Sequence, residues 1–492
     1  MYLEQLGIFG WNRRDEALLL ASLLTGDPLL LIGNHGCAKT HLGNKIAQAL
    51  GKKYLVYDAS KAMFEDVLGY PNVQKLGQGE VEYVPSPVTI WDKELIIIDE
   101  LNRAVPELQS KWLEIIRSRK VMGFHTQVKW VWAAMNPSSY AGANALDEAL
   151  IGRFALFMYP PDVLKMDEEN RIKVLTHING EDAPSLHQWT ETGENAGTVS
   201  VDSVKQAGDS MKEVLQLAAK RFLQLREQFA SLPAFLARFA ALLAQESNGQ
   251  LELDGRRLGF VYRNLLAARA VEIAMAEIHG SDLSAFRDSA RHVLLASLPI
   301  GLNEDSLDWD EANHKVEVCF DLLSEYFQHG ADLSQVDLVY ELLTTPNLLR
   351  KAELLLDHEL GDMAKSKAWQ DLMDEERDLT VLAYTALVVE SHRPGVVPSE
   401  LLESLSASVN PAMLSSSCIP NLMDDCVEHV DEVEGLLDQP TDLRRLVAFT
   451  RVKSLIDSGK VNPEALHETH NHIQQDIEAF EKLMSTTQEE AA

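Results

Sequence analysis

The chain has 492 residues, more than a single hydrophobic core organises, so its length predicts roughly two to four domains. It carries 44 basic and 75 acidic residues, and the net charge of −31 disfavours binding to nucleic-acid phosphates. The four cysteines show neither metal-ligand nor disulfide-framework spacing and the N-terminus lacks a signal-like apolar core, so we expect a cytosolic, reduced protein without direct membrane insertion.

Four short apolar runs predict buried strands in the first third of the chain. They are residues 29–32, 54–59, 95–98 and 128–135. Such runs, separated by stretches with helical spacing, are typical of a parallel sheet in an α/β fold. We therefore predict an α/β core over residues 1–165.

Residues 33–40, GNHGCAKT, follow the first apolar run and precede a helical pattern. A glycine-rich turn between a strand and a helix directs backbone N–H groups at one point, which suits phosphates. We expect Lys39 to neutralise the β- and γ-phosphates and the Thr40 hydroxyl to coordinate Mg²⁺. Ala38 departs from the pattern G-x-x-x-x-G-K-[ST], which leaves a simple helix-capping turn as the alternative. The residues predicted to cradle the nucleotide are Gly33, Asn34, His35, Gly36, Cys37, Ala38, Lys39 and Thr40.

Two later stretches are candidates for hairpins inserted into the core. Residues 69–84 contain a Gly-Gln-Gly turn between short alternating runs, and residues 121–128 form the second candidate. The alternative for both is an extension of the sheet edge.

The run ELIIIDE, residues 94–100, ends in two adjacent carboxylates some 60 residues after Lys39. In a phosphate-loop enzyme the first, Asp99, holds Mg²⁺ through its water shell, and the second, Glu100, polarises the attacking water as general base. Four aliphatic residues before the acids favour this interpretation over a pair of surface carboxylates.

Two further residues complete a hydrolytic site. Asn136 ends the apolar strand VKWVWAAMN, where its amide can position the attacking water. Arg153 follows in the segment LDEALIGRF. Taken singly, each residue has a simpler interpretation, because an asparagine at a strand end is often a turn residue and a lone arginine is often a solvated helix charge.

Beyond the core the sequence becomes helical. Residues 166–230 are predicted to be a connecting segment with a helix, and the polar stretch 191–203 a loop within it. The sequence SLPA from Ser231 is typical of a helix start with a capping serine and an early proline, and it opens a helical lid over residues 231–300. Residues 301–492 show helical patterns and no strand series, which predicts an α-helical C-terminal domain.

This C-terminal domain is strongly acidic. Residues 301–492 hold 39 of the 75 acidic and 13 of the 44 basic residues. The excess predicts either a solvated helical surface or a docking surface for a basic partner.

Together these motifs resemble the MoxR family of AAA+ ATPases. The phosphate loop of that family reads G-x-P-G-x-A-K-T, so Ala38 is the family's own residue, and the departure is His35, where proline is usual. Residues 86–121 are similar to the family's Walker B region, including Asn102-Arg103-Ala104 and Gln109. AAMNP is similar to its sensor 1, and ALDEALIGRF to the stretch that carries its arginine finger. The close resemblance covers roughly residues 10–160, and a weaker one extends to about residue 300.

The resemblance implies an AAA+ core, a parallel sheet sandwiched by helices, with a helical lid. It also implies a ring, usually a hexamer, with ATP and Mg²⁺ bound between neighbouring subunits. Arg153 would reach the γ-phosphate held by the next subunit as a finger supplied in trans. The sequence DGRR, residues 254–257, resembles the sensor 2 motif, in which we favour Arg256 over Arg257 as the residue that touches phosphates. Hairpins such as those above face the pore or a partner in this family.

The function implied is that of a ring-shaped, chaperone-like ATPase that remodels or activates a partner protein complex. Relatives often act with proteins that carry a von Willebrand factor A domain, whose D-x-S-x-S pattern this chain lacks. Two alternatives remain open. One is a nucleotide-gated scaffold that docks a partner through its acidic helices and depends little on hydrolysis. The other is a nucleic-acid motor, which the negative charge disfavours.

Overall fold

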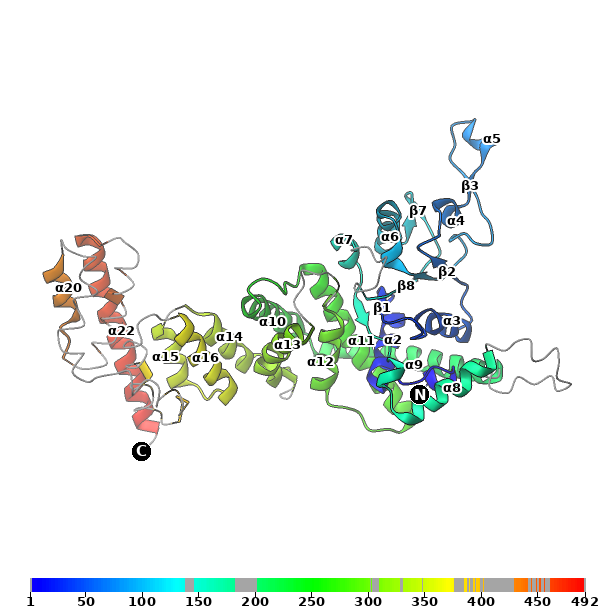
Figure 1. The fold of residues 1–492 in the computed structure, drawn as a ribbon. Coiled ribbons are helices and arrows are strands. Elements are labelled where there is room, and N and C mark those ends of the chain that lie inside the picture. The colour runs from blue at the N-terminus through cyan, green and yellow to red at the C-terminus, as the bar shows by residue number, and fades with distance from the viewer. Residues whose placement is uncertain are drawn as a thin grey trace. The chain divides into compact units, whose positions relative to one another are not determined.

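The computed structural model describes two compact units that divide after residue 331, and each is treated by itself. Figure 1 shows the elements of both units. The described residues are 2–137, 146–181, 201–300, 302, 309–327, 331–346, 348–375, 429–440 and 461–490, with single residues and short pieces between 385 and 455.

A five-stranded parallel sheet forms the centre of the first unit (Figure 1). Its spatial order is β2 (Tyr54–Asp58), β5 (Leu95–Asp99), β8 (Trp130–Met135), β1 (Leu29–Ile32) and β9 (Leu156–Met158). The four predicted strands are confirmed. The strand β9 was not predicted, because three apolar residues directly after a helical pattern give no strand signal of their own.

Helices cover both faces of this sheet, as predicted for the α/β core. Along β5 the side chains alternate between the two layers. Leu95 and Ile97 pack with Ala47 of α3 (Lys39–Ala49) on one face. Ile96 and Ile98 lie in the core cluster of the other face with residues of α6 (Pro106–Ser118).

Most of the remaining elements of the first unit are helices. The two long helices α9 (Val201–Gln228) and α11 (Gly255–His279) pack along each other and against α2 (Arg13–Thr25). The shorter helices are α1 (Tyr2–Gln5), α4 (Phe64–Leu68), α7 (Glu148–Ile151), α8 (Glu168–Glu181), α10 (Leu232–Glu246), α12 (Phe286–Ala296) and α13 (Trp309–Leu323). The N-terminal stretch joins this helical layer, because Tyr2, Leu3 and Leu6 are buried.

Two details of the predicted helical part are wrong. The helix expected at Ser231 is present as α10, but Ser231 makes no capping hydrogen bond. Its hydroxyl instead donates to the carbonyl of Ala331 at 2.9 Å and lies 3.1 Å from the hydroxyl of Tyr326. The predicted loop 191–203 lies largely outside the described residues, and its last three residues already belong to α9.

Both predicted hairpins are present as separate two-stranded sheets, which excludes an extension of the main sheet. The first pairs β3 (Tyr70–Pro71) with β4 (Tyr83–Val84) and carries the short helix α5 (Val73–Leu76) at its tip. The second pairs β6 (Lys120–Val121) with β7 (Phe124–His125).

The only regular elements described in the second unit are helices, which confirms a mostly α-helical C-terminal region. Its helices are α14 (Ser334–Thr344), α15 (Leu348–Asp357), α16 (Asp362–Glu375), α20 (Val430–Leu437) and α22 (Pro463–Glu490). Among the described helices of the chain, none is both long enough and apolar enough to cross a membrane.

Gly208 provides a test of how tightly α9 packs on the sheet layer. A Cβ atom at this position would lie 1.8 Å from the carbonyl oxygen of Ala49, at the end of α3. We expect Gly208→Ala to lower the free energy of unfolding by about 3 kcal/mol, because backbone must move to admit the methyl group. Chemical denaturation followed by circular dichroism measures this.

Gly259→Ala is the matched control. Gly259 also lies inside a long helix, α11, but a Cβ there would meet only the Arg263 guanidinium at 3.9 Å. Alanine at this position should stabilise the chain by about 0.5–1 kcal/mol through helix propensity. Equal effects of the two substitutions would contradict the close packing of α9 on α3.

Candidate functional site

The phosphate loop, residues 33–40, connects the end of β1 to the first turn of α3. Two of its residues have left-handed backbone conformations, Gly36 with φ 82° and Ala38 with φ 55°. The first costs a glycine nothing, whereas the second strains an alanine by about 1 kcal/mol. The exposed side chains of Asn34 and His35 lie at the tip of the loop. Strain of this kind persists only where the surrounding fold imposes the conformation.

Lys39 lies at the centre of the loop. Its ammonium group donates to the carbonyls of Gly33 at 2.8 Å and Asn34 at 2.9 Å, and to Oδ1 of Asn136 at 3.2 Å. These three acceptors match the three N–H donors of a lysine. Burial lowers the pKa of Lys39, while Cys37, Asp99 and Glu100 raise it. The lysine therefore holds the two ends of the loop and the end of β8 around one positive charge.

Thr40 and Asp99 face each other beside the lysine. The Thr40 hydroxyl donates to Oδ2 of Asp99 at 2.5 Å, and Oδ1 of Asp99 accepts the backbone N–H of Glu100 at 2.9 Å. Glu100 itself has a left-handed backbone, φ 52°, directly after β5. Its carboxylate lies 3.4 Å from the guanidinium of Arg103.

The Thr40 and Asp99 oxygens suit Mg²⁺, which prefers hard oxygen ligands and keeps several waters and phosphate oxygens in its shell. No group of three or more His, Cys, Asp or Glu side chains that could hold a metal occurs in the described part of the chain. A hydroxyl and one carboxylate are enough protein ligands for an ion whose other ligands are phosphate oxygens and waters.

Asn136 forms hydrogen bonds through its backbone carbonyl as well as through its side chain, which bonds to Lys39. The buried Asn102 donates from Nδ2 to the Asn136 carbonyl at 2.9 Å. Asn102 follows Glu100 by two residues, in a short 3₁₀ turn over Leu101–Arg103. Sequence reasoning assigned Asn102 no role beyond membership of a motif. In the structure its side chain links the turn after β5 to the residue that follows β8.

Two small cavities flank the loop. One, of about 240 Å³, is lined by polar groups that include Lys39, Asp99, Glu100 and Asn136. The other, of about 250 Å³, lies on the α3 side of the loop, at Gly36 and His41. Apolar side chains from three segments complete this second cavity: Ile8, Phe9, Trp11, Val163, Met166 and Val174.

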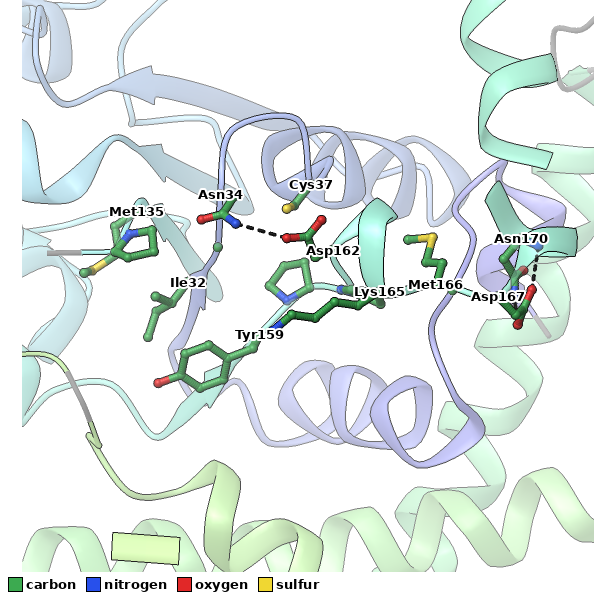
Figure 2. Close-up of a pocket in the computed structure, with 15 residues that line it drawn as sticks. Ile32, Asn34, Cys37, Met135, Tyr159, Asp162, Lys165, Met166, Asp167 and Asn170 are labelled. Carbon is green, nitrogen blue, oxygen red and sulfur yellow. Dashed lines mark hydrogen bonds between the residues drawn. The ribbon is translucent and has the colours of Figure 1, made fainter. Parts of the chain in front are cut away.

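A third and larger cavity, of about 560 Å³, lies on the other side of the loop (Figure 2). Its far wall is the segment after β9, residues 159–167, here called the strap. The Asn34 amide donates to Asp162 of the strap at 3.1 Å, and Figure 2 shows this bond crossing the cavity. Cys37 of the loop and Pro161 and Met166 of the strap line both this cavity and the apolar one, so the two cavities adjoin there.

Arg153 lies at the opposite edge of the sheet from the phosphate loop. The loop follows the carboxyl end of β1, whereas Arg153 precedes the amino end of β9, which runs parallel to β1. The N–H of Ala155 donates to the carbonyl of Pro28, at the entry to β1, at 2.9 Å. Arg153 therefore cannot reach the phosphate loop of its own chain.

The two candidate sensor arginines have different environments. Arg257 is buried, and its guanidinium donates to the carbonyls of Phe154 at 2.5 Å, Ser297 at 3.1 Å and Ile151 at 3.4 Å. Burial lowers its pKa to about 10. Arg256 is exposed and lies near Gly152, so the structure brings it together with Arg153 and not with Lys39. Of the pair, Arg256 is the one whose side chain is available to a ligand.

Comparisons with known proteins identify the α/β part. Residues 28–154 match the sequence profile described as an AAA domain of the dynein-related subfamily. This span contains the phosphate loop, both acids, Asn136 and Arg153. The chain therefore carries an AAA domain, with the parallel sheet and flanking helices described above.

Two individual proteins are more distantly similar. The structural protein ORF618 of Acidianus two-tailed virus is 26% identical over 233 residues, which are 44% of this chain and 37% of the viral protein. The chain thus spans little more than a third of that relative's length. A crystal structure of a presumed ATPase from Cytophaga hutchinsonii is 19% identical, with a TM-score of 0.40 over 64% of this chain and 92% of that one, which is too low to support a statement on function.

The contrast between Arg257 and Arg256 predicts effects of very different size on stability. Arg257→Met should lower the free energy of unfolding by about 3 kcal/mol, because buried carbonyls lose a charged donor. Arg256→Met, which removes the same group one residue away, should change it by less than about 0.5 kcal/mol. Urea denaturation of both variants measures this, and a larger effect for Arg256→Met would reverse the assignment.

Proposed function

We propose that the chain is an ATP-hydrolysing AAA+ ATPase of the MoxR type that works as a ring. The observation that carries the proposal is the convergence of four groups at one edge of the sheet. Lys39, the Thr40–Asp99 pair, Glu100 and Asn136 come from the ends of three neighbouring strands and surround a single polar cavity. This set suits the charges and the attacking water of phosphoryl transfer.

In the proposed reaction the phosphate chain of ATP lies in the loop, where Lys39 exchanges carbonyl contacts for oxygens of the β- and γ-phosphates. When bound beside Thr40 and Asp99, Mg²⁺ neutralises phosphate charge. Asn136 orients a water molecule, and Glu100 accepts its proton. The water oxygen bonds to the γ-phosphorus as the bond to the β–γ bridging oxygen breaks, which yields ADP and phosphate.

The apolar cavity on the α3 side suits the nucleoside. It adjoins Gly36, Cys37 and Ala38, so a phosphate chain in the loop can continue directly into it. Its wall combines aromatic and aliphatic side chains, which favour a flat base over water. The N-terminal segment supplies part of this wall through residues 7–11.

A second copy is needed to complete the site. Arg153 faces away from the phosphates of its own chain, and its buried Nε has no hydrogen-bond partner among the described residues. A ring in which each Arg153 approaches the next copy's γ-phosphate gives this group an acceptor. We propose a hexamer, as in the family that the motifs resemble.

The proposed role of the ring is to remodel or activate a partner protein complex, with a separate von Willebrand factor A protein as a candidate partner. The first hairpin and its approach, residues 63–84, support contact with another protein. They expose large apolar side chains to solvent: Met63, Tyr70, Val73, Leu76, Val81 and Val84. Such a cluster on a projecting element is typical of an interaction site.

Glu100→Gln tests the assignment of the general base. The amide keeps the shape of the side chain but cannot accept a proton, so ATP turnover should fall by about 100-fold or more while ATP binding persists. Lys39→Ala should abolish both ATP binding and ATP turnover. Steady-state phosphate release and binding of a fluorescent ATP analogue measure the two properties.

Glu94→Gln is the control for that experiment. Glu94 lies at the opposite end of the same strand and pairs with Lys52 and Lys129 at the surface. The substitution Glu94→Gln should therefore leave ATP turnover unchanged. Unaltered turnover in Glu100→Gln would contradict the assignment of Glu100 as the general base.

A mixing experiment tests Arg153 in trans. Lys39→Ala and Arg153→Ala chains should each be nearly inactive, because an arginine finger contributes about 10³-fold or more to turnover. Mixed rings should regain activity, since some interfaces join an intact loop to an intact arginine. A mixture no more active than its two components would exclude the trans assignment.

A further inference from the structure

Three arginines meet at the sheet edge opposite the phosphate loop: Arg117, Arg153 and Arg256. The entry to β1, residues 26–28, brings their elements together. Arg119, at the end of α6, donates to the carbonyl of Gly26 at 2.9 Å. Ala155, two residues after Arg153, bonds to Pro28. On α11, Arg263 holds Asp27 with bonds of 2.8 and 3.2 Å, two helical turns beyond Arg256.

None of the three guanidinium groups has a hydrogen bond or an ion pair with any residue that the structure describes. Arg256 and Arg117 each lower the pKa of Arg153, after the larger effect of burial. Asp254 opposes them, but its side chain already caps α11 by accepting the Arg257 N–H at 2.6 Å. With three guanidinium groups and one carboxylate, the cluster therefore keeps a net positive charge.

Arg117, in the last turn of α6, makes no hydrogen bond or ion pair with the residues that the structure describes. Arg119, two residues on, anchors the end of the helix through the carbonyls of Gly26, Lys129 and Ile116 and is mostly buried. Gln109 fixes the other end, because its Oε1 accepts the N–H of Asp147 before α7 at 3.3 Å. Arg117 is left exposed beside Arg153, on a helix that is held at both ends.

We propose that Arg117 is a third cation of a composite receptor, with Arg153 and Arg256, for the triphosphate bound to a second copy of the chain. This inference rests on the proposed function. A triphosphate presents several charged oxygens, and guanidinium groups bind such oxygens in pairs. The loop of the same chain is excluded as the source, because β1 alone separates it from the cluster by about 13 Å.

The test compares three variants of the full-length chain. Arg117→Gln should lower kcat about tenfold, less than the loss caused by an absent arginine finger, because two cations of the receptor remain. Binding of an ATP analogue to the variant's own loop should be unchanged. Arg117→Lys should recover part of the rate. Lys111→Gln removes a charge from an exposed position of the same helix and should leave kcat as in the wild type.

Mixing then separates a role in trans from a structural one. Arg117→Gln chains have intact loops, and Lys39→Ala chains have intact arginines, so their mixture should turn over faster than the two components measured apart. A folding defect in Arg117→Gln would not be repaired in this way.

Two results would count against these proposals, and they are distinguishable. If the wild-type chain hydrolyses ATP and Arg117→Gln matches Lys111→Gln, or its loss is not recovered on mixing, the role of Arg117 is overturned and the ATPase assignment stands. If the wild-type chain shows no turnover in its assembled form, the proposed function itself fails.

Discussion

The parallel direction of the five central strands is the constraint on which the candidate site depends. Parallel strands end at one edge of a sheet, so residues far apart in the chain meet there when each follows a strand. Lys39, Asp99 and Asn136 meet in this way, after β1, β5 and β8. The same constraint sends Arg153, which precedes β9, to the opposite edge. One topological fact thus accounts both for the polar cavity and for the distance of Arg153 from it.

The site also stores backbone strain. Ala38 and Glu100 both adopt left-handed conformations, and neither is a glycine. Each lies next to a functional side chain or carries one, and each occurs where a strand gives way to a tight turn. Hydrogen bonds around them, from Lys39 to the loop carbonyls and from Glu100 N–H to Asp99, offset the cost. Ala38 is therefore accommodated in a left-handed conformation that a glycine would adopt without strain.

Sequence reasoning predicted the features that depend on local pattern. The apolar runs identified four strands, and the turn before Lys39 identified the loop. It did not identify β9, whose three residues are strand only because Pro28 and β1 offer them partners. It favoured Arg256 over Arg257 but could not predict that Arg257 is buried, because adjacent residues of a helix differ only in what packs against each face. The hydrogen bonds made by Asn102, Gln109 and Asp162 could not be predicted either, since each joins segments that only tertiary packing brings together.

Helix α11 and the strap are held to the rest of the first unit by hydrogen bonds of different number and strength, so moving them would cost different amounts of free energy. Helix α11 is tied to the sheet by Arg257, through three carbonyls, and by Arg263 and Asn264 at Asp27. Rotation of α11 against the sheet would expose or break several charged hydrogen bonds, each worth about 1.5–3 kcal/mol. The strap, in contrast, meets the phosphate loop side chain to side chain through Asn34 and Asp162. The strap is therefore held to the phosphate loop far less firmly than α11 is held to the sheet, and α11 keeps Arg256 beside Gly152, the residue before Arg153.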